Sequence, residues 1–376
     1  MDDLMTGHED LSEIKNICEE INKLLKAGGF HMQKWSSNSE ALLKFLQDDN
    51  KRKETVDKME IKLDKVIKIL GLTWDRNDDI FKITVNLPEV RNSVTKRLIL
   101  SDVASLFDPF GWLAPVIITA KVMIQKLWLC NHGWDEELPA ELIDEWMTYR
   151  DELNELQMIE IPRWIEITSR CKDIELHGFA DASSVAYSAV AYVRVVDQDD
   201  VVHVTIIAAK TKVAPLKQLS IPKLELCGAV LLAKLLHELS YLLNIPMDKI
   251  YAWTDSMVVL AWLQSQPSRW QVFVGNRVSE IIQIIDNDRW RHVQSRDNPA
   301  DLASRGIRAR DMLGNEMWWT GPEWLKHNDS EFTRAPIPQT NLEMKKTFHI
   351  NLADAPIWER FSTMSRLKRV LAQCRR

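Results

Sequence analysis

Four acidic residues stand where a carboxylate could take part in chemistry. Asp181 lies within a run of apolar and small residues that extends from His177 to Val193. A carboxylate buried there must find a metal ion, a cation or hydrogen-bond donors, because an unpaired buried charge is too costly to keep. The alternative is a turn, since Asp-Ala-Ser-Ser could cap the end of a strand. The choice between the two depends on three later acids: Glu225, Asp255 and Asp301.

Each of the later acids also has an ordinary structural explanation. Glu225 falls in the first turn of a helix that Pro222 opens, where an acid favours the helix dipole. Asp255 joins a predicted strand to a predicted helix, which is the usual place of an N-cap. Asp301 falls in the first turn of a helix that starts at an Asn-Pro pair. Taken singly, none of these acids requires a catalytic role.

The elements that carry these acids predict the fold class. Three strands rich in Val, Ile and Tyr are expected over 173–180, 184–195 and 201–210, which suggests an antiparallel meander. An apolar helix over 222–239 must lay one face on the sheet. Further elements are predicted over 249–254 (strand), 257–263 (helix), 271–285 (helix) and 290–293 (strand). This order predicts an α/β (mixed α+β) domain over 172–310, with a five-stranded mixed sheet and helices on both faces.

The flanking regions differ from this pattern. Before residue 170, helices are predicted over 9–27, 95–107, 115–129 and 134–153, with a short strand over 30–35 and a hairpin over 70–85. Residues 311–376 contain a polar, Pro-containing stretch that is typical of a linker, then a basic amphipathic helix over 358–376. Its basic face could contact nucleic acid or simply be solvated.

Composition limits the classes of function. The 376 residues, 45% of them hydrophobic, suffice for two to three domains. A net charge of -6 argues against broad binding to a polyanion, but acids that hold metal ions contribute to that total, so a nucleic-acid enzyme is not excluded. Five cysteines without a CxxC pair disfavour a disulfide framework and a zinc site. The acidic start is unlike a signal peptide and no apolar run reaches about 18 residues, so we expect an intracellular protein, cytoplasmic or nuclear, that is not secreted and has no membrane partner.

Several stretches resemble the Pol polyprotein of Bel/Pao long-terminal-repeat retrotransposons. They are Met1–Gly7, Gly28–Asn38, Leu70–Trp74 and Lys96–Pro115. In that family a Tyr-Val-Asp-Asp turn carries two palm carboxylates of the reverse transcriptase, and Asp2 and Asp3 resemble those two. The resemblance implies that residues 1–165 are a truncated polymerase: a palm edge, a primer-grip hairpin and thumb-like helices. Two adjacent Asp cannot position two metal ions alone, so reverse transcriptase activity is not expected. Nor is the aspartic peptidase activity ascribed to this region of the family, because the sequence has no Asp-Thr-Gly or Asp-Ser-Gly triplet.

Residues 172–310 resemble ribonuclease H, in which acids follow one another in the order Asp, Glu, Asp, Asp on the same kinds of element. The motifs are Gly178–Ser183, Lys223–Leu226, Thr254–Ser256 and Asn298–Arg305. The resemblance implies hydrolysis of the RNA strand of an RNA/DNA hybrid, recognised through its 2′-hydroxyl groups, with two Mg²⁺ ions held by oxygen ligands. On this interpretation Asp181 bridges the ions, Glu225 and Asp255 complete one side, and Asp301 holds the other ion. Mn²⁺ could substitute.

One departure and two alternatives accompany this interpretation. Many ribonuclease H enzymes carry a His in the loop before the last acid, whereas residues 294–298 contain none, and His292 is expected to be packed or at the surface. Residues 311–376 resemble the connection to an integrase that the sequence does not include. A non-catalytic remnant that binds nucleic acid or acts structurally is the alternative to an enzyme. A third hypothesis is that the chain works with a complete reverse transcriptase or integrase in trans. Nothing in the sequence predicts the oligomeric state.

Overall fold

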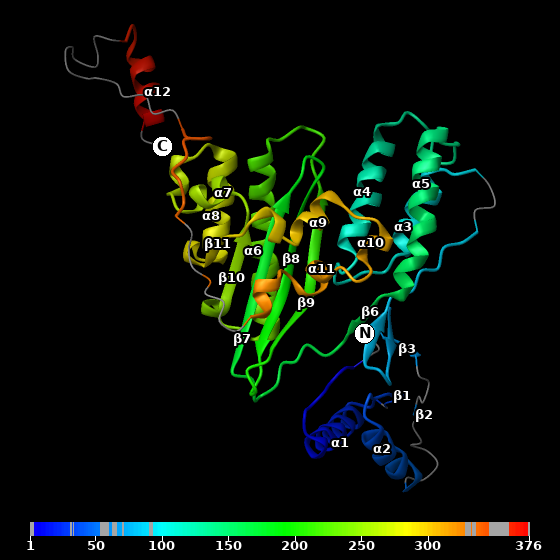
Figure 1. Ribbon diagram of the computed structural model, residues 1–376. Coiled ribbons are helices and arrows are strands. Elements are labelled where there is room, and N and C mark those ends of the chain that lie inside the picture. Colours follow the sequence, from blue (N-terminus) through cyan, green and yellow to red (C-terminus); the bar gives the residue numbers. More distant parts are fainter. Residues whose placement is uncertain are drawn as a thin grey trace.

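A computed structural model describes residues 4–30, 32, 34–52, 60–61, 66–69, 71–89, 93–327, 332, 336–345 and 361–374. Asp2 and Asp3, the predicted polymerase remnant, lie outside the described residues. A five-stranded sheet in the order β11-β10-β7-β8-β9 occupies the middle of the molecule (Figure 1). Its strands are β7 (Asp173–Ala182), β8 (Ala186–Val196), β9 (Val202–Val213), β10 (Ile250–Thr254) and β11 (Trp290–His292).

The sheet is mixed, as predicted. Strands β7, β8 and β9 pair antiparallel, whereas β10 is parallel to both β7 and β11. The carboxyl ends of β7 and β10 therefore meet at the same edge of the sheet. Because side chains alternate between faces along a strand, Phe179 and Asp181 point to one face and Ala180 points to the other.

Three helices cover the Ala180 face: α6 (Ile221–Leu243), α7 (Met257–Leu263) and α8 (Val272–Ile284). Helix α6 packs leucines and alanines on buried residues of β7 and β8. Its length and composition would also suit a membrane span, which corrects the expectation that no segment passes that test. Over half of that stretch, 56%, is buried within the protein, which is the placement of a core helix.

The opposite face is covered by helices that precede and follow the sheet in the sequence. They are α4 (Ala114–Leu129), α9 (Ala300–Arg305), α10 (Ala309–Met312) and α11 (Glu316–Thr320). Trp318 and Leu325 are completely buried there, against the face of the sheet that carries Phe179 and Tyr192. Residues 309–327 thus belong to this core, although sequence alone suggested a connecting segment after residue 310. The predicted domain limits themselves stay predictions.

The helical region before the sheet is attached to edge strand β9. It contains α3 (Lys96–Ser105) and α5 (Ala140–Glu152), which pack with α4 around the fully buried Trp146. The backbone carbonyl of Phe110 accepts a hydrogen bond from Ala209 N (2.8 Å), and Trp112 Nε1 donates to Ile207 O (3.1 Å). Gly111 between them has φ +75°, and a Cβ there would stand 1.8 Å from Ala209 O. This loop covers an edge strand that would otherwise present unpaired backbone groups.

The N-terminal region and the last helix lie away from the central sheet (Figure 1). Helices α1 (Leu11–Ala27) and α2 (Glu40–Arg52) pack together through apolar side chains, and the first of these matches the predicted helix. The predicted hairpin over 70–85 is confirmed as β4 (Leu72–Asp75) and β5 (Ile80–Lys82). The predicted strand over 30–35 is described only as β1 (Lys34–Trp35), paired with β2 (Glu60–Ile61). The remaining elements are β3 (Val66–Ile69), β6 (Glu160–Pro162) and α12 (Met364–Cys374).

Candidate active site

Asp181 lies at the carboxyl end of β7 and is only 5% exposed. The hydroxyl group of Ser304 donates a hydrogen bond to its Oδ2. Burial raises the pKa of Asp181 to about 7; the charges of Asp255 and Asp301 act in the same direction, and the Ser304 hydrogen bond opposes them. Asp181 is therefore a carboxyl group whose ionised form is poorly solvated by its surroundings.

Glu225 approaches from α6, on the opposite face of the sheet. The helix can come close because residue 228 is Gly: a Cβ there would stand 3.0 Å from the backbone oxygen of Asp181. Ser256 donates its hydroxyl hydrogen to Glu225 Oε2 and accepts a bond from Val259 N (3.2 Å) as the N-cap of α7. Burial raises the pKa of Glu225, and the charge of Asp255 adds to this effect.

Asp255 follows β10 directly and precedes this N-cap. Ser295 donates a hydrogen bond to its Oδ2 at 2.6 Å. Its other oxygen, Oδ1, is buried and has no hydrogen-bond partner within the described part of the chain. Because buried polar atoms are nearly always paired, this oxygen is a candidate ligand for a cation.

Asp301 and Ser304 are both supplied by α9, one helical turn apart. Asp301 forms an ion pair with Arg305 at 2.5 Å. Three hydrogen bonds hold the helix and its preceding loop on the sheet: Ser183 Oγ to Ser304 O (2.8 Å), Ser188 Oγ to Ala300 O (2.7 Å) and Asn298 Nδ2 to Ala180 O (3.1 Å). The position of Asp301 is thus fixed relative to β7 and β8.

The structure brings all four predicted acids to one edge of the sheet, where the charges of Asp255 and Asp301 act on Asp181 and that of Asp255 on Glu225. Each acid has one oxygen engaged by a serine or arginine donor. Among the described residues, no three His, Cys, Asp or Glu side chains are gathered as a ready metal site. The roles assigned to the acids stay predictions. Sequence reasoning missed the three serine partners, although Ser256 and Ser304 could have been found from their spacing of one and three residues after Asp255 and Asp301.

The loop before α9 contains no histidine side chain, and its residues Ser295–Asp297 form a short 3-10 turn. His292 ends β11 and is half-buried, which agrees with the expectation of a packed or surface residue. Arg296 in this loop is largely exposed and pairs with Asp297 at 3.8 Å.

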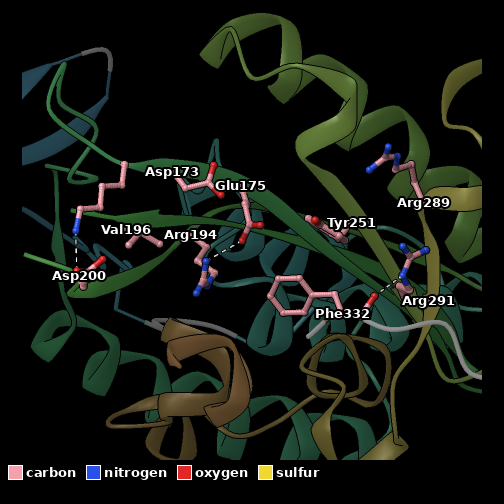
Figure 2. A pocket seen from close by; sticks show the side chains of 10 residues that line it. Asp173, Glu175, Arg194, Val196, Asp200, Tyr251, Arg289, Arg291 and Phe332 are labelled. Carbon is pink, nitrogen blue, oxygen red and sulfur yellow. Dashed lines mark hydrogen bonds and ion pairs between the residues drawn. The ribbon is translucent and has the colours of Figure 1, made fainter. Parts of the chain in front are cut away.

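A cavity of about 460 Å³ is lined by residues that include Asp173 and Glu175 (Figure 2). These two residues lie at the end of β7 opposite to Asp181. Arg194 and Glu175 line the cavity and form an ion pair at 2.9 Å. Lys172 pairs with Asp200 at 2.6 Å, and Arg291 Nε donates to Phe332 O at 2.8 Å. These charged groups are already paired with neighbouring groups, so the cavity is a weaker candidate for an active site than the edge of the sheet that carries the four acids.

Comparison with known proteins finds a family model that matches part of this chain. Residues 95–256 match the family model described as the Pao retrotransposon-like RNaseH-like domain. The match includes α3 to α5, strands β7 to β10 and the first three of the four acids. It confirms the resemblance to Bel/Pao Pol and the presence of an RNaseH-like domain. A comparison with curated proteins gives no significant match.

Three solved structures are similar to the chain at low sequence identity. The N-terminal RNase H domain of a Mycobacterium tuberculosis protein, fused to maltose-binding protein, has 14% identity and a TM-score of 0.24, covering 35% of this chain and 95% of that one. RNase H1 from Halobacterium salinarum has 14% identity and a TM-score of 0.22, covering 34% and 89%. The foamy viral protease-reverse transcriptase in complex with double-stranded DNA has 13% identity and a TM-score of 0.20, covering 76% and 52%.

Proposed function

We propose that this chain, whose residues 95–256 match the Pao retrotransposon-like RNaseH-like family, is a nuclease of the ribonuclease H type that hydrolyses the RNA strand of an RNA/DNA hybrid. The observation that carries the proposal is the placement of four acids at one edge of the sheet, where the charges of Asp255 and Asp301 act on Asp181 and that of Asp255 acts on Glu225. An intracellular location and a need for a reverse transcriptase or integrase in trans stay predictions.

The side chains at this edge fit divalent cations. The candidate ligands are all carboxylate oxygens, which Mg²⁺ prefers and Mn²⁺ accepts. The buried Oδ1 of Asp255, which lacks a hydrogen-bond partner in the described part of the chain, would gain a partner. The repulsion from Asp255 and Asp301, which adds to the effect of burial on the pKa of Asp181, would be offset. Asp181, Glu225, Asp255 and Asp301 would hold the ions, which would supply activation of water and stabilisation of charge on the leaving oxygen.

The chain itself keeps the carboxylates in place. Ser304 and Ser256 orient Asp181 and Glu225, and Ser295 bonds only Oδ2 of Asp255, so that its Oδ1 has no hydrogen-bond partner among the described residues. Close approach of α6 to β7 at Gly228 places the first turns of α6, which carry Glu225, against the strand that carries Asp181. Positioning of this kind is what phosphoryl transfer requires of a protein.

A non-catalytic remnant is less well supported. Such a module would have no use for Asp181 and Glu225, whose pKa values are raised by burial and by the charges of nearby acids, since a neutral residue at either position would avoid the cost of a buried charge. Reverse transcriptase and aspartic peptidase activities are not proposed.

The test is cleavage of a labelled RNA/DNA hybrid by the purified full chain, with and without Mg²⁺, beside single-stranded RNA and double-stranded DNA. We expect Mg²⁺-dependent cleavage of the RNA strand that Asp255→Asn abolishes, because that variant replaces the candidate ligand atom. Asp248→Asn is the matched control, since Asp248 is an exposed residue near the opposite end of β10. Cleavage by Asp255→Asn at the rate of the unmodified chain would contradict the proposal.

A further inference from the structure

We infer that Lys223 marks a binding position for a backbone phosphate of the nucleic acid, and that Glu343 occupies this position in the present structure. The inference rests on the proposed function, because it concerns how the same substrate reaches the four acids. Residues 336–345, named here the strap, would then compete with the substrate for the first turn of α6.

The strap is docked on the connection between α7 and α8. Its backbone and that of the connection form a short antiparallel bridge between Trp270 and Met344. The hydrogen bonds are Gln271 N to Glu343 O (2.8 Å), Lys345 N to Arg269 O (3.0 Å) and Trp262 Nε1 to Leu342 O (3.0 Å). The strap therefore has a defined register, which delivers one particular side chain to α6.

That side chain is Glu343, whose Oε1 lies 2.8 Å from Lys223 Nζ. The pair is largely shielded from solvent, with side-chain exposures of 19% for Glu343 and 23% for Lys223. Glu343 has φ +61°, in the left-handed region that residues other than glycine seldom adopt. Such a conformation persists only when surrounding contacts hold it, and here the docked strap supplies them.

The surroundings of Lys223 favour an anion. Lys223 is in the first turn of α6, where the helix dipole attracts negative charge. The guanidinium group of Arg277 stacks on the ring of Phe273 at 3.6 Å, and Lys223 Nζ lies 5.7 Å from the same ring. Arg277 forms no ion pair with any residue that the structure describes, so the second cation at this position is not neutralised.

The location relative to the acids identifies the anion as a backbone phosphate. Lys223 precedes Glu225 by two residues, so both lie near the N-terminal end of α6, although their side chains leave the helix in different directions. A duplex carries about one negative charge per 1.7 Å of its axis, so a hybrid that presents one phosphodiester to the acids lays others over this turn. The carboxylate of Glu343 then occupies the position at which a phosphate oxygen would accept a hydrogen bond from Lys223.

The experiment measures binding of a fluorescent RNA/DNA hybrid to the full chain by anisotropy in EDTA, where cleavage plays no part. Glu343→Gln should bind several-fold more tightly, because Lys223 is released. Lys223→Gln should bind several-fold more weakly, with a salt dependence smaller by about one counterion. In the double variant the effect of Glu343→Gln should vanish, because there is no cation left to release. Glu323→Gln, which removes an exposed ion pair with Lys326, is the matched control.

Three results would overturn the inference: unchanged affinity of Glu343→Gln, additive effects in the double variant, or a lower melting temperature of Glu343→Gln without tighter binding. The last result would show that the ion pair only stabilises the fold. The same variants distinguish this inference from the proposed function. If Glu343→Gln binds the hybrid more tightly but the chain does not cleave the hybrid in Mg²⁺, only the proposed function is contradicted. Absence of hybrid binding by all variants would contradict both.

Discussion

Asp181→Asn should stabilise the metal-free protein at neutral and alkaline pH while abolishing its proposed activity. The carboxyl group of Asp181 is 5% exposed, and burial raises its pKa from 3.8 to about 7. An Asn side chain is neutral at every pH and can still accept the hydrogen bond from Ser304 through its amide oxygen. The substitution therefore removes the cost of a buried charge and leaves the packing in place.

The magnitude follows from linkage between protonation and folding. Because the folded pKa exceeds the unfolded one, the folded state binds more protons between these values, and stability of the unmodified chain falls as the pH rises from about 4 to about 7. A difference of about three pKa units corresponds to at most about 4 kcal/mol, reached above pH 7 and absent below pH 4. The advantage of Asp181→Asn over the unmodified chain should follow the same curve.

The assay is thermal unfolding of both proteins in EDTA from pH 5 to pH 8, with Asp248→Asn as an exposed control that should shift the melting temperature little. We expect Asp181→Asn to melt several degrees higher at pH 8 and the gap to narrow towards pH 5. Addition of Mg²⁺ should stabilise the unmodified chain more than the variant. A variant that melts no higher at pH 8, or a gap independent of pH, would refute the reasoning about Asp181.

Two further predictions concern groups that support the site. Ser304→Ala removes a hydrogen bond that lowers the pKa of Asp181. The apparent pKa of the acidic limb in a pH–rate profile should therefore rise by about one unit. An unchanged acidic limb would show that Ser304 does not affect the pKa of this carboxyl group. Trp318→Ala leaves a cavity at a fully buried position between the sheet and Trp112. Chemical denaturation should show that the free energy of unfolding falls by about 3–5 kcal/mol. A fall below about 0.5 kcal/mol, typical of a surface substitution, would contradict the packing of residues 309–327 on the sheet.

The central sheet could be predicted because its signals are local. Enrichment in Val, Ile and Tyr indicates the strands β7, β8 and β9, and a proline indicates the start of α6, so the predicted bounds of these elements fall within a few residues of the observed ones. The attachment of distant segments could not be predicted. Contacts such as Trp318 Nε1 to Trp112 O join residues 206 positions apart, and no local pattern carries that information.

The same division applies to the candidate site. The four acids were found because their order and their elements resemble a known arrangement. Their partners on other elements, such as Ser295 for Asp255, depend on how loops fold over the sheet. The pairing of Glu343 with Lys223 lay in a stretch that sequence reasoning took for a linker, because a docked strap without regular structure has the same composition as a free one.

The most direct test of the central claim is the rate of RNA cleavage in an RNA/DNA hybrid by the full chain and by Asp255→Asn, each with and without Mg²⁺. Removal of one ligand oxygen from a site that acts by metal-assisted hydrolysis should abolish turnover. We predict cleavage by the unmodified chain in Mg²⁺ only, and none by a folded Asp255→Asn variant. Equal cleavage by the two proteins, or none by a folded unmodified chain that binds the hybrid, would contradict the account.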